Sequence, residues 1–394
     1  MISINQNTKQ EVHMSQHKKI NVAIIGCGAI SDAYMTNLKT RFTSIQLTAC
    51  SDLNIDRMNE KASCYDIRAM SFEDILKDSG IDMIINLTNP AAHYPIIKAA
   101  LTADKHVYSE KMLATTFEQA TELCAIADKQ QKYLGVAPDT FLGGTIQTAR
   151  YLIDHGMIGR PLSCMVSLSR DFEIFGEILP HLRQSGGDLA MDTGCYYLVA
   201  LASLFGPAET VAAFKTTNNP DRIMHRIDRA DFQQSYHIDV ENVMTAAIRY
   251  KNGLLGSLHI NSDCIFNENR IFRIFGTEGI INIDDPNKFG SKITIQKPFG
   301  EEISFPLTHG FQDECRGIGA AEMAWAIIHG RPNRASKEMG LHVLEMIQGM
   351  FVSSGSSAFY QLESSFEQPA PLPAGYVSGN EYGMWAPTEE TALV

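Results

Sequence analysis

INVAIIGCGAIS, residues 20 to 31, breaks an apolar run with two closely spaced glycines and then continues in a helical pattern. This order is typical of a strand that feeds a dinucleotide-binding turn. Gly26 suits the tight turn and Gly28 lets the backbone approach a pyrophosphate, while Ala29 and Ile30 lead into a helix whose free amides receive its charge. Ser31 stands where many such turns carry a third glycine or alanine, so an ordinary strand-to-helix turn is the alternative interpretation.

A second apolar segment, residues 45 to 50, ends in Ser51 and Asp52. A carboxylate at the end of the second strand accepts hydrogen bonds from both ribose hydroxyls of NAD and repels the 2′-phosphate of NADP. The sequence therefore predicts NAD as the cofactor. Arg57 lies close enough in sequence to contact the adenosine ribose or a phosphate there, and the alternative is a solvated helix residue.

The chain has 394 residues, of which 44% are hydrophobic, and this favours two domains with a large core. A net charge of −12 offers no basic field to a nucleic acid or an anionic membrane. No apolar run approaches the roughly 18 residues of a transmembrane helix, and the polar N-terminus lacks a signal-peptide core. The eight cysteines are scattered without a CxxC pair, so we expect a cytoplasmic protein with reduced thiols and no metal site.

Up to residue 140, short apolar strands alternate with helical patterns, as a parallel sheet with right-handed crossovers requires. Strands are expected at 81–87, 105–111 and 133–137, and helices at 91–102 and 117–130. Ligands of an open α/β sheet gather outside the carboxyl ends of its strands. The groups expected around that crevice are the glycine turn, Asp52, Thr88, Asn89, Pro90, Glu110 and Lys111.

Beyond residue 160, apolar runs of strand length are separated by short turns. The expected strands are 161–169, 209–216, 240–250, 253–262, 270–276, 279–283 and 292–297, and helices follow at 313–330 and 337–353. The predicted class is α/β. Its parts are a flexible tail at 1–17, a Rossmann domain with a doubly wound parallel sheet at 18–140, a second α/β domain at 141–375 and an extended arm at 376–394.

Several motifs together resemble one enzyme family. They are GCGAIS (26–31), TNPAAH (88–93), AALTADKHVYSEKM (99–112), GMIGRP (156–161), GGDLAMDTG (186–194) and GTEG (276–279). From about residue 18 to 375 the chain resembles the glucose-fructose oxidoreductase, inositol dehydrogenase and MocA (Gfo/Idh/MocA) group of NAD(P)-dependent sugar oxidoreductases. The resemblance implies an N-terminal Rossmann domain and a C-terminal domain whose open, largely antiparallel sheet commonly mediates oligomer contacts.

In that family the segment around Lys111 usually reads Glu-Lys-Pro, with a cis proline bond that helps to aim the ammonium at the nicotinamide and the substrate. Here Met112 replaces the proline, so a cis and a trans peptide both stay open. In a desolvated cleft beside a positive nicotinamide, the pKa of Lys111 is expected to fall, which suits proton exchange with a substrate hydroxyl. The alternative is a surface lysine at a strand end.

Asp192 and Tyr196 lie four residues apart, so a helix that begins nearby places both on one face. The resemblance implies an aspartate followed four residues later by a histidine or a tyrosine, and this chain follows the tyrosine pattern. Tyr196 is then predicted to hydrogen-bond the reacting hydroxyl and to pass its proton, tuned by Lys111 and Asp192. The alternative is an interior aromatic. Gly186 and Gly187 would let the loop pass close to a sugar ring.

Four other polar residues are candidates. His93 lies near the start of the helix after Pro90 and resembles a family position close to the cofactor, with a structural role at the helix start as the alternative. Asp139 follows the last strand of the first domain and is a candidate for cofactor or substrate contact. His181 and Arg183 lie in a polar stretch and are candidates for sugar hydroxyls, with solvated loop residues as the alternative.

The sequence therefore predicts an NAD-dependent dehydrogenase that transfers a hydride between nicotinamide and the carbon of a secondary hydroxyl in a sugar, cyclitol or glycoside. The expected substrate contacts are Lys111, Asp139, His181, Arg183, Asp192 and Tyr196. A homo-oligomer, dimer or tetramer, is expected. Two alternatives stay open: an NAD-dependent glycosidase that oxidises its sugar only transiently, and a non-catalytic NAD-binding regulator.

Overall fold

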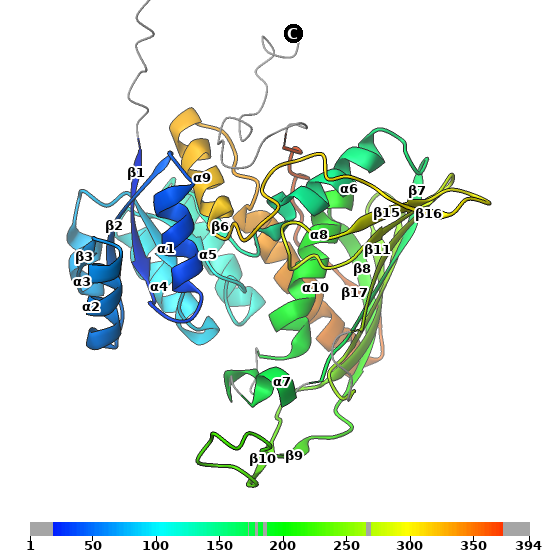
Figure 1. The fold of residues 1–394 in the computed structure, drawn as a ribbon, viewed down its shortest axis with the longest axis horizontal. Coiled ribbons are helices and arrows are strands. Elements are labelled where there is room, and N and C mark those ends of the chain that lie inside the picture. Colours follow the sequence, from blue (N-terminus) through cyan, green and yellow to red (C-terminus); the bar gives the residue numbers. More distant parts are fainter. Residues whose placement is uncertain (1–18, 172, 178–179, 184–186, 265–268, 373–394) are drawn as a thin grey trace, which may run out of the picture.

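The computed structural model describes residues 19–171, 173–177, 180–183, 187–264 and 269–372. The predicted tail at 1–17, the predicted arm at 376–394 and Gly186 lie outside these residues. Figure 1 shows two sheets side by side, one wrapped by helices and the other a large curved wall with helices along one face.

Six parallel strands form the first sheet, in the order β3-β2-β1-β4-β5-β6. The strands are β1 (Ile20–Ile25), β2 (Ile45–Ser51), β3 (Arg68–Ala69), β4 (Met83–Asn86), β5 (His106–Ser109) and β6 (Leu134–Val136). The central strands β1 and β4 are almost entirely buried, as a parallel sheet covered on both faces requires. The strand order reverses between β1 and β4, and ligands of open α/β sheets bind at such a switch point.

Helices connect these strands and pack against the sheet. They are α1 (Ser31–Thr40), α2 (Ile55–Cys64), α3 (Phe72–Lys77), α4 (Pro90–Thr102) and α5 (Phe117–Lys129). Much later in the chain, α9 (Ile318–His329) returns to contact β5 and β6. This helix is apolar and buried over most of its length, so it needs a surface on each side. This helix lies in the second predicted domain but packs on the sheet of the first, across the division expected at residue 140.

Nine strands form the second sheet, in the order β16-β15-β14-β13-β7-β12-β11-β8-β17. They are β7 (Pro161–Ser169), β8 (Ala208–Thr216), β11 (Val243–Tyr250), β12 (Leu255–Asn261), β13 (Asn269–Gly276), β14 (Ile280–Ile283), β15 (Ile293–Gln296), β16 (Glu302–Ser304) and β17 (Tyr360–Gln361). Every neighbouring pair is antiparallel except β7 with β12. Three helices, α6 (Gly144–Asp154), α8 (Cys195–Phe205) and α10 (Lys337–Ser356), lie along one face (Figure 1).

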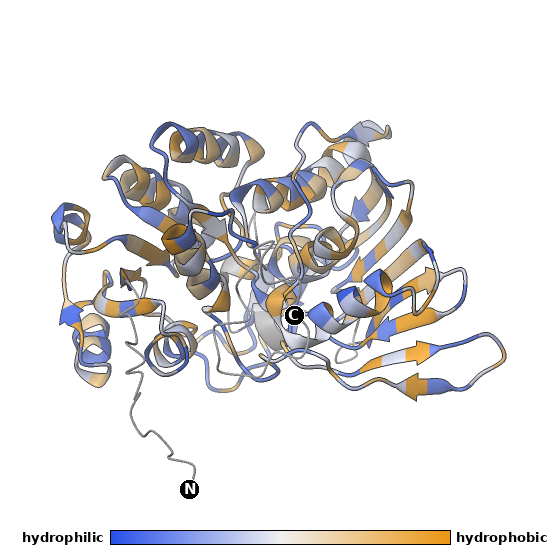
Figure 2. Ribbon diagram, turned by 90° about the horizontal axis from the view of Figure 1, so that it is seen from above, coloured by the Kyte–Doolittle hydropathy of each residue, from blue (hydrophilic) through white to orange (hydrophobic). Residues whose placement is uncertain are grey.

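Polar and apolar residues alternate along the strands of this sheet (Figure 2). The alternation arises because the pleat of a strand turns successive side chains to opposite faces of the sheet. The buried side chains pack toward the helices. On the other face, Met165, Phe214 and Leu255 are exposed large apolar side chains. The second sheet therefore keeps an open face with apolar residues on it.

A small lobe projects beyond the second sheet (Figure 1). It contains α7 (Glu173–Gly176), the 3₁₀ turn η2 (Pro180–Arg183), and the antiparallel pair β9 (Asp221–Ile223) and β10 (Ser235–His237). Its own core is small, with Leu182, Ile238 and Val240 packed against Tyr236. Sequence patterns did not predict this lobe.

The predicted α/β class, with a parallel sheet followed by a mostly antiparallel one, is confirmed. The two remaining elements are the 3₁₀ turn η1 (Thr140–Leu142) and the π-helical turn η3 (Ala190–Gly194). Within the described ranges, no helix combines the length and the apolar character of a membrane span.

Candidate functional site

The turn between β1 and α1 is shaped by two glycines. Gly26 has a φ of 98°, and a Cβ there would lie 2.9 Å from the backbone carbonyl carbon of Leu87, so only glycine fits without moving the backbone. A Cβ at Gly28 would meet nothing within 4 Å, and Ala29 beside it is exposed. Ile30 precedes α1 without a side-chain cap, and the Ser31 amide donates to the carbonyl oxygen of Gly28, so the next amides of the first turn are the ones available to an anion. The turn therefore fits a dinucleotide pyrophosphate.

Asp52 follows β2, at the edge expected to receive the adenosine ribose. Its Oδ2 accepts the amide of Cys27 at 2.7 Å, and its Oδ1 lies 2.6 Å from the guanidinium of Arg57. Burial alone raises the pKa of Asp52, but hydrogen bonds from Arg57 and from two backbone amides outweigh it and lower the pKa. Arg57 is 46% exposed, so this cation is the partner that a ligand can displace. The structure thus brings Asp52 and Arg57 together.

The loop after β4 leads through Thr88 and the exposed Asn89 into α4, which begins at Pro90. His93 in this helix is completely buried. Its Nδ1 lies 2.6 Å from the carbonyl oxygen of Met112, and its Nε2 lies 2.9 Å from that of Thr88. Burial lowers the pKa of His93. We therefore correct the prediction that His93 contacts the cofactor. Its ring lies in the core and contacts the carbonyl oxygens of two loops.

Glu110 follows β5 and has a protein partner on each carboxylate oxygen. The Tyr34 hydroxyl donates to Oε1 at 2.8 Å, and the amide of Lys111 donates to Oε2 at 3.1 Å. The peptide between Lys111 and Met112 is cis, which settles the question left open by the sequence. Glu110 therefore orients the segment from which Lys111 extends.

The side chain of Lys111 meets the backbone and the carboxylate of Asp192. Its Nζ donates to the carbonyl oxygen of Asp192 at 2.6 Å and to Oδ1 of the same residue at 2.9 Å. The two side chains are 18% and 27% exposed, so a ligand can still reach the pair. The structure therefore brings together two of the three predicted catalytic residues.

The fall in the pKa of Lys111 was expected beside a positive nicotinamide and stays a prediction for that state. Burial does act to lower the pKa, but the nearby Asp192 carboxylate outweighs it, and the pKa of Lys111 is raised. Burial likewise acts to raise the pKa of Asp192, while Lys111 and then Arg170 lower it well below its usual range. The resting pair is an ammonium and a carboxylate.

Tyr196 completes this cluster from the first turn of α8, directly after the π-helical turn that holds Asp192. Nζ of Lys111 lies 5.5 Å from the centroid of its ring. Burial raises the pKa of Tyr196 to about 12, against the lowering effect of Lys111. The charge of Arg316 also acts to lower the pKa of Tyr196. Tyr196 is thus a neutral hydroxyl flanked by two cations.

Arg170 is a site residue that the sequence analysis missed. It follows β7, and its guanidinium lies 3.3 Å from Oδ2 of Asp192, which also accepts the hydroxyl of Thr193 at 3.0 Å. A recess beside Asp192 is lined by Arg170, Leu182, Gly187, Leu189, Asp192 and Ser262. The available signal was an arginine placed directly after an alternating strand. Gly187, which was expected to lie close to a sugar ring, is one of these lining residues.

Asp139 has a different role from the one expected. It is 1% exposed, and its Oδ2 accepts the amides of Gly317 and Gly319, each at 3.0 Å. Burial raises the pKa of Asp139 to about 6. We therefore correct the prediction that Asp139 contacts the substrate. Its carboxyl group accepts hydrogen bonds from amides at the start of α9, which have no partners within the helix.

The lobe holds the two remaining candidates, and the structure describes the side chain of one of them, Arg183. Nε of Arg183 donates to the carbonyl oxygen of Gly176 at 2.9 Å, and its guanidinium stacks 3.9 Å above the ring of Tyr236. Arg183 thus has partners inside the lobe instead of the substrate contact expected. His181 belongs to η2, and its side chain lies outside the described part of the structure.

Two family models match this chain. One, an oxidoreductase family with an NAD-binding Rossmann fold, matches residues 20–137, and the other, the GFO/IDH/MocA C-terminal domain, matches residues 146–282. Together the two ranges cover more than half of the 394 residues. The chain belongs to the Gfo/Idh/MocA family. The predicted family, the oxidoreductase class and NAD as the cofactor are confirmed.

The chain is similar in sequence to several known oxidoreductases. Oxidoreductase YrbE of Bacillus subtilis is 24% identical over 272 residues, which are 68% of this chain and 74% of that protein. D-xylose dehydrogenase of Paenarthrobacter nicotinovorans is 28% identical over 159 residues, 38% of this chain and 40% of the relative. Inositol 2-dehydrogenase/D-chiro-inositol 3-dehydrogenase of Lacticaseibacillus casei is 28% identical over 150 residues, 36% and 42% of the two chains. The last two matches span less than half of those relatives.

Solved structures share the whole fold. Levoglucosan dehydrogenase in complex with NADH and L-sorbose has a TM-score of 0.77 and 20% identity, covering 88% of this chain and 99% of that one. Aldose-aldose oxidoreductase from Caulobacter crescentus, complexed with glycerol, has a TM-score of 0.74 and 19% identity, covering 88% and 100%. At these identities the likeness shows the fold.

Proposed function

We propose that this family member is an NAD-dependent dehydrogenase that moves a hydride between its cofactor and the carbon of a secondary hydroxyl in a neutral sugar, cyclitol or glycoside. The observation that carries the proposal is the ammonium of Lys111, held by Asp192 with the ring of Tyr196 5.5 Å away. Relatives named for D-xylose and for inositols support the substrate class.

Bound NAD supplies the hydride acceptor, the C4 carbon of its nicotinamide. Asp192 keeps Lys111 charged and aimed, and the ammonium stabilises the substrate oxygen as negative charge develops on it. Tyr196 hydrogen-bonds that oxygen. In the direction of oxidation it takes up the hydroxyl proton as its own proton moves to Lys111, which must first have released a proton to water. In the direction of reduction, protonated Lys111 supplies the proton that the new hydroxyl needs.

The charges of the recess favour a neutral ligand. Arg170 lines the recess but already contacts Asp192, whose other oxygen faces Lys111. Phosphate is usually bound by arginines whose donors face the anion. These engaged charges support a neutral, multiply hydroxylated substrate over a phosphorylated sugar.

A panel of sugars, cyclitols and glycosides with added NAD tests the proposal through the absorbance of NADH. Net NADH formation on a neutral polyol is expected. Cleavage of a glycoside without net NADH would instead support the glycosidase alternative. Tight NAD binding without turnover on the whole panel would support the regulator. Activity on phosphorylated sugars alone would contradict the proposed substrate class.

We also propose a cytoplasmic homo-oligomer, a dimer or a tetramer. The eight free cysteines support a reducing compartment. The exposed Met165, Phe214 and Leu255 on the open face of the second sheet support a contact between copies. Sedimentation velocity at micromolar concentration tests this, and a single monomeric species would contradict it.

A further inference from the structure

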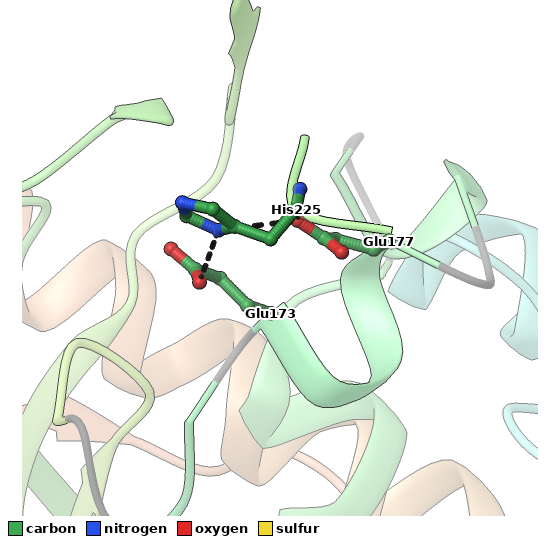
Figure 3. Close-up of side chains that lie close together, drawn as sticks. All are labelled: Glu173, Glu177 and His225. Atoms are coloured by element: carbon green, nitrogen blue, oxygen red, sulfur yellow. Dashed lines mark hydrogen bonds and ion pairs between the residues drawn. The ribbon is translucent and has the colours of Figure 1, made fainter. Parts of the chain in front are cut away.

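Glu173, Glu177 and His225 gather in the lobe (Figure 3). Glu173 begins α7, Glu177 follows it four residues later, and His225 comes two residues after β9. One ligand atom from each residue lies within 4.8 Å of the other two. Segments about fifty residues apart in the chain therefore aim three possible metal ligands at one point.

The spacing of these atoms suits a small cation. Nδ1 of His225 lies 2.9 Å from Oε2 of Glu173 and 3.7 Å from Oε1 of Glu177. Ligand atoms about 2.0 to 2.2 Å from a tetrahedral zinc ion lie roughly 3.4 Å from one another. Small side-chain movements would bring the cluster to that geometry, because His225 is 62% exposed.

Glu177 is the strongest observation for a cation. It is only 2% exposed, and its Oε1 accepts the amide of His225 at 2.8 Å. A buried carboxylate requires a compensating positive charge. The nearby Arg226 and Arg229 each lie 2.8 Å from a carboxylate two residues further on, so their charges are already engaged.

Arg222 and Tyr236 lie beside the cluster. Oε1 of Glu173 lies 3.3 Å from Arg222, whose guanidinium also lies 2.8 Å from Asp263, and this leaves Oε2 for the cation. The buried hydroxyl of Tyr236 has no hydrogen-bond partner among the described residues. Tyr236 lies opposite Arg222 in the pairing of β9 with β10, and Arg222 contacts Glu173. A water on the cation would give this hydroxyl a partner.

We propose that Glu173, Glu177 and His225 bind one Zn²⁺ ion, with water as the fourth ligand. An imidazole with two carboxylates favours a first-row transition metal, whereas Mg²⁺ and Ca²⁺ prefer six or more oxygen ligands. The site ties α7 to the segment after β9. Because Arg170 lies three residues before Glu173, the ion would steady the strand end that contacts Asp192.

Direct Zn²⁺ titration of the untagged full-length protein, freed of metal by a chelator, tests the site. Wild type should bind one Zn²⁺ per chain at this site, and His225→Ala and Glu173→Gln should weaken that binding roughly 10-fold or more, since even outer-shell changes cost 10- to 100-fold. His237→Ala is the matched control. His237 also lies beside a carboxylate, 2.7 Å from Asp221, but this pair is exposed and should not contribute to that binding.

Equal Zn²⁺ binding by wild type and His225→Ala, or no binding by wild type, would overturn the proposal and leave an ion pair between His225 and Glu173. Mg²⁺ binding as tight as Zn²⁺ binding would overturn the choice of metal. Circular dichroism of each metal-free variant checks that it is folded, and Glu173→Gln keeps the shape of the side chain while removing its charge. The site is supported if both folded variants lose Zn²⁺ binding and His237→Ala keeps it.

Discussion

The ammonium nitrogen of Lys111 lies 2.9 Å from Oδ1 of Asp192 and 2.6 Å from the carbonyl oxygen of the same residue. The lysine follows β5 of the parallel sheet, and the aspartate lies in the turn that precedes α8 of the second part of the fold. This contact therefore links the two sheets at the switch-point edge. It also decides the charge of Lys111, the residue that we propose faces a substrate oxygen.

Asp192→Asn should shift the pH dependence of the reaction. Asp192 raises the pKa of Lys111, and without its charge the remaining effect of burial lowers that pKa. Ketone reduction needs protonated Lys111, so its rate falls as the pH rises through the pKa. The alkaline fall in kcat should therefore begin at lower pH in the variant than in wild type. Coincident pH profiles of NADH oxidation would contradict the role given to Asp192.

Tyr196→Phe should lower kcat roughly 100-fold, the usual contribution of a positioned proton-transfer group. The change removes one hydroxyl and keeps the ring beside Lys111. Tyr197→Phe is the matched control, because the ring of Tyr197 packs 5.8 Å from that of Phe272 on the sheet side. Steady-state turnover of both variants checks this. A similar loss in both would show that the helix, and not the Tyr196 hydroxyl, is responsible.

Asp52→Ala should weaken NAD binding roughly 10- to 100-fold, because charge-assisted hydrogen bonds to the ribose contribute about 1.5 to 3 kcal/mol. The same change should relax the rejection of NADP. Arg57→Ala is the companion variant, and it should leave NAD binding nearly unchanged since Arg57 is displaced by the ribose. Fluorescence titration gives the dissociation constants. Equal or tighter binding of NADP by wild type would show that Asp52 does not select the cofactor.

Acid should destabilise the fold through His342. Burial lowers its pKa to about 4, and its Nε2 accepts the amide of Ala208 at 2.9 Å, which requires a neutral ring. The unfolded chain takes up the proton near pH 6.5, so this stability is present at pH 7 and is lost as the pH falls from 6.5 to about 4. Roughly 2 kcal/mol should be lost between pH 7 and pH 5.

Urea unfolding at the two pH values measures this loss. His342→Gln removes the titrating group, so the free energy of unfolding of the variant should fall less on acidification than that of wild type. An equal fall would assign the acid sensitivity to other groups.

Much of the fold could be predicted because local patterns express it. The run at 161–169 alternates as β7 does, and Gly26 after β1 carries the steric demand of the turn. The packing of α9 on the first sheet could not be predicted, because the apolar pattern of a helix does not identify the surface that it packs against. The lobe could not be predicted either, because its core has only a few residues and ion pairs supply many of its contacts.

The sequence singled out Lys111, Asp192 and Tyr196, which the structure brings together, but not the partner Arg170. The pKa of Lys111 depends on Asp192, which lies 81 residues away in the chain. His93 and Asp139 are polar residues at strand ends, as ligand contacts often are, yet both bind backbone groups in the core. Burial, which distinguishes these cases, is not visible in a local pattern.

The most direct test of the account is the Lys111→Ala variant, assayed with the most active polyol and, separately, for NAD binding. Proton transfer by a positioned group contributes roughly 100-fold or more, so kcat should fall by at least that much. The dissociation constant of NAD should change little, because the glycine turn and Asp52 hold the cofactor. Turnover equal to that of wild type would contradict the central claim that Lys111 serves the reacting hydroxyl.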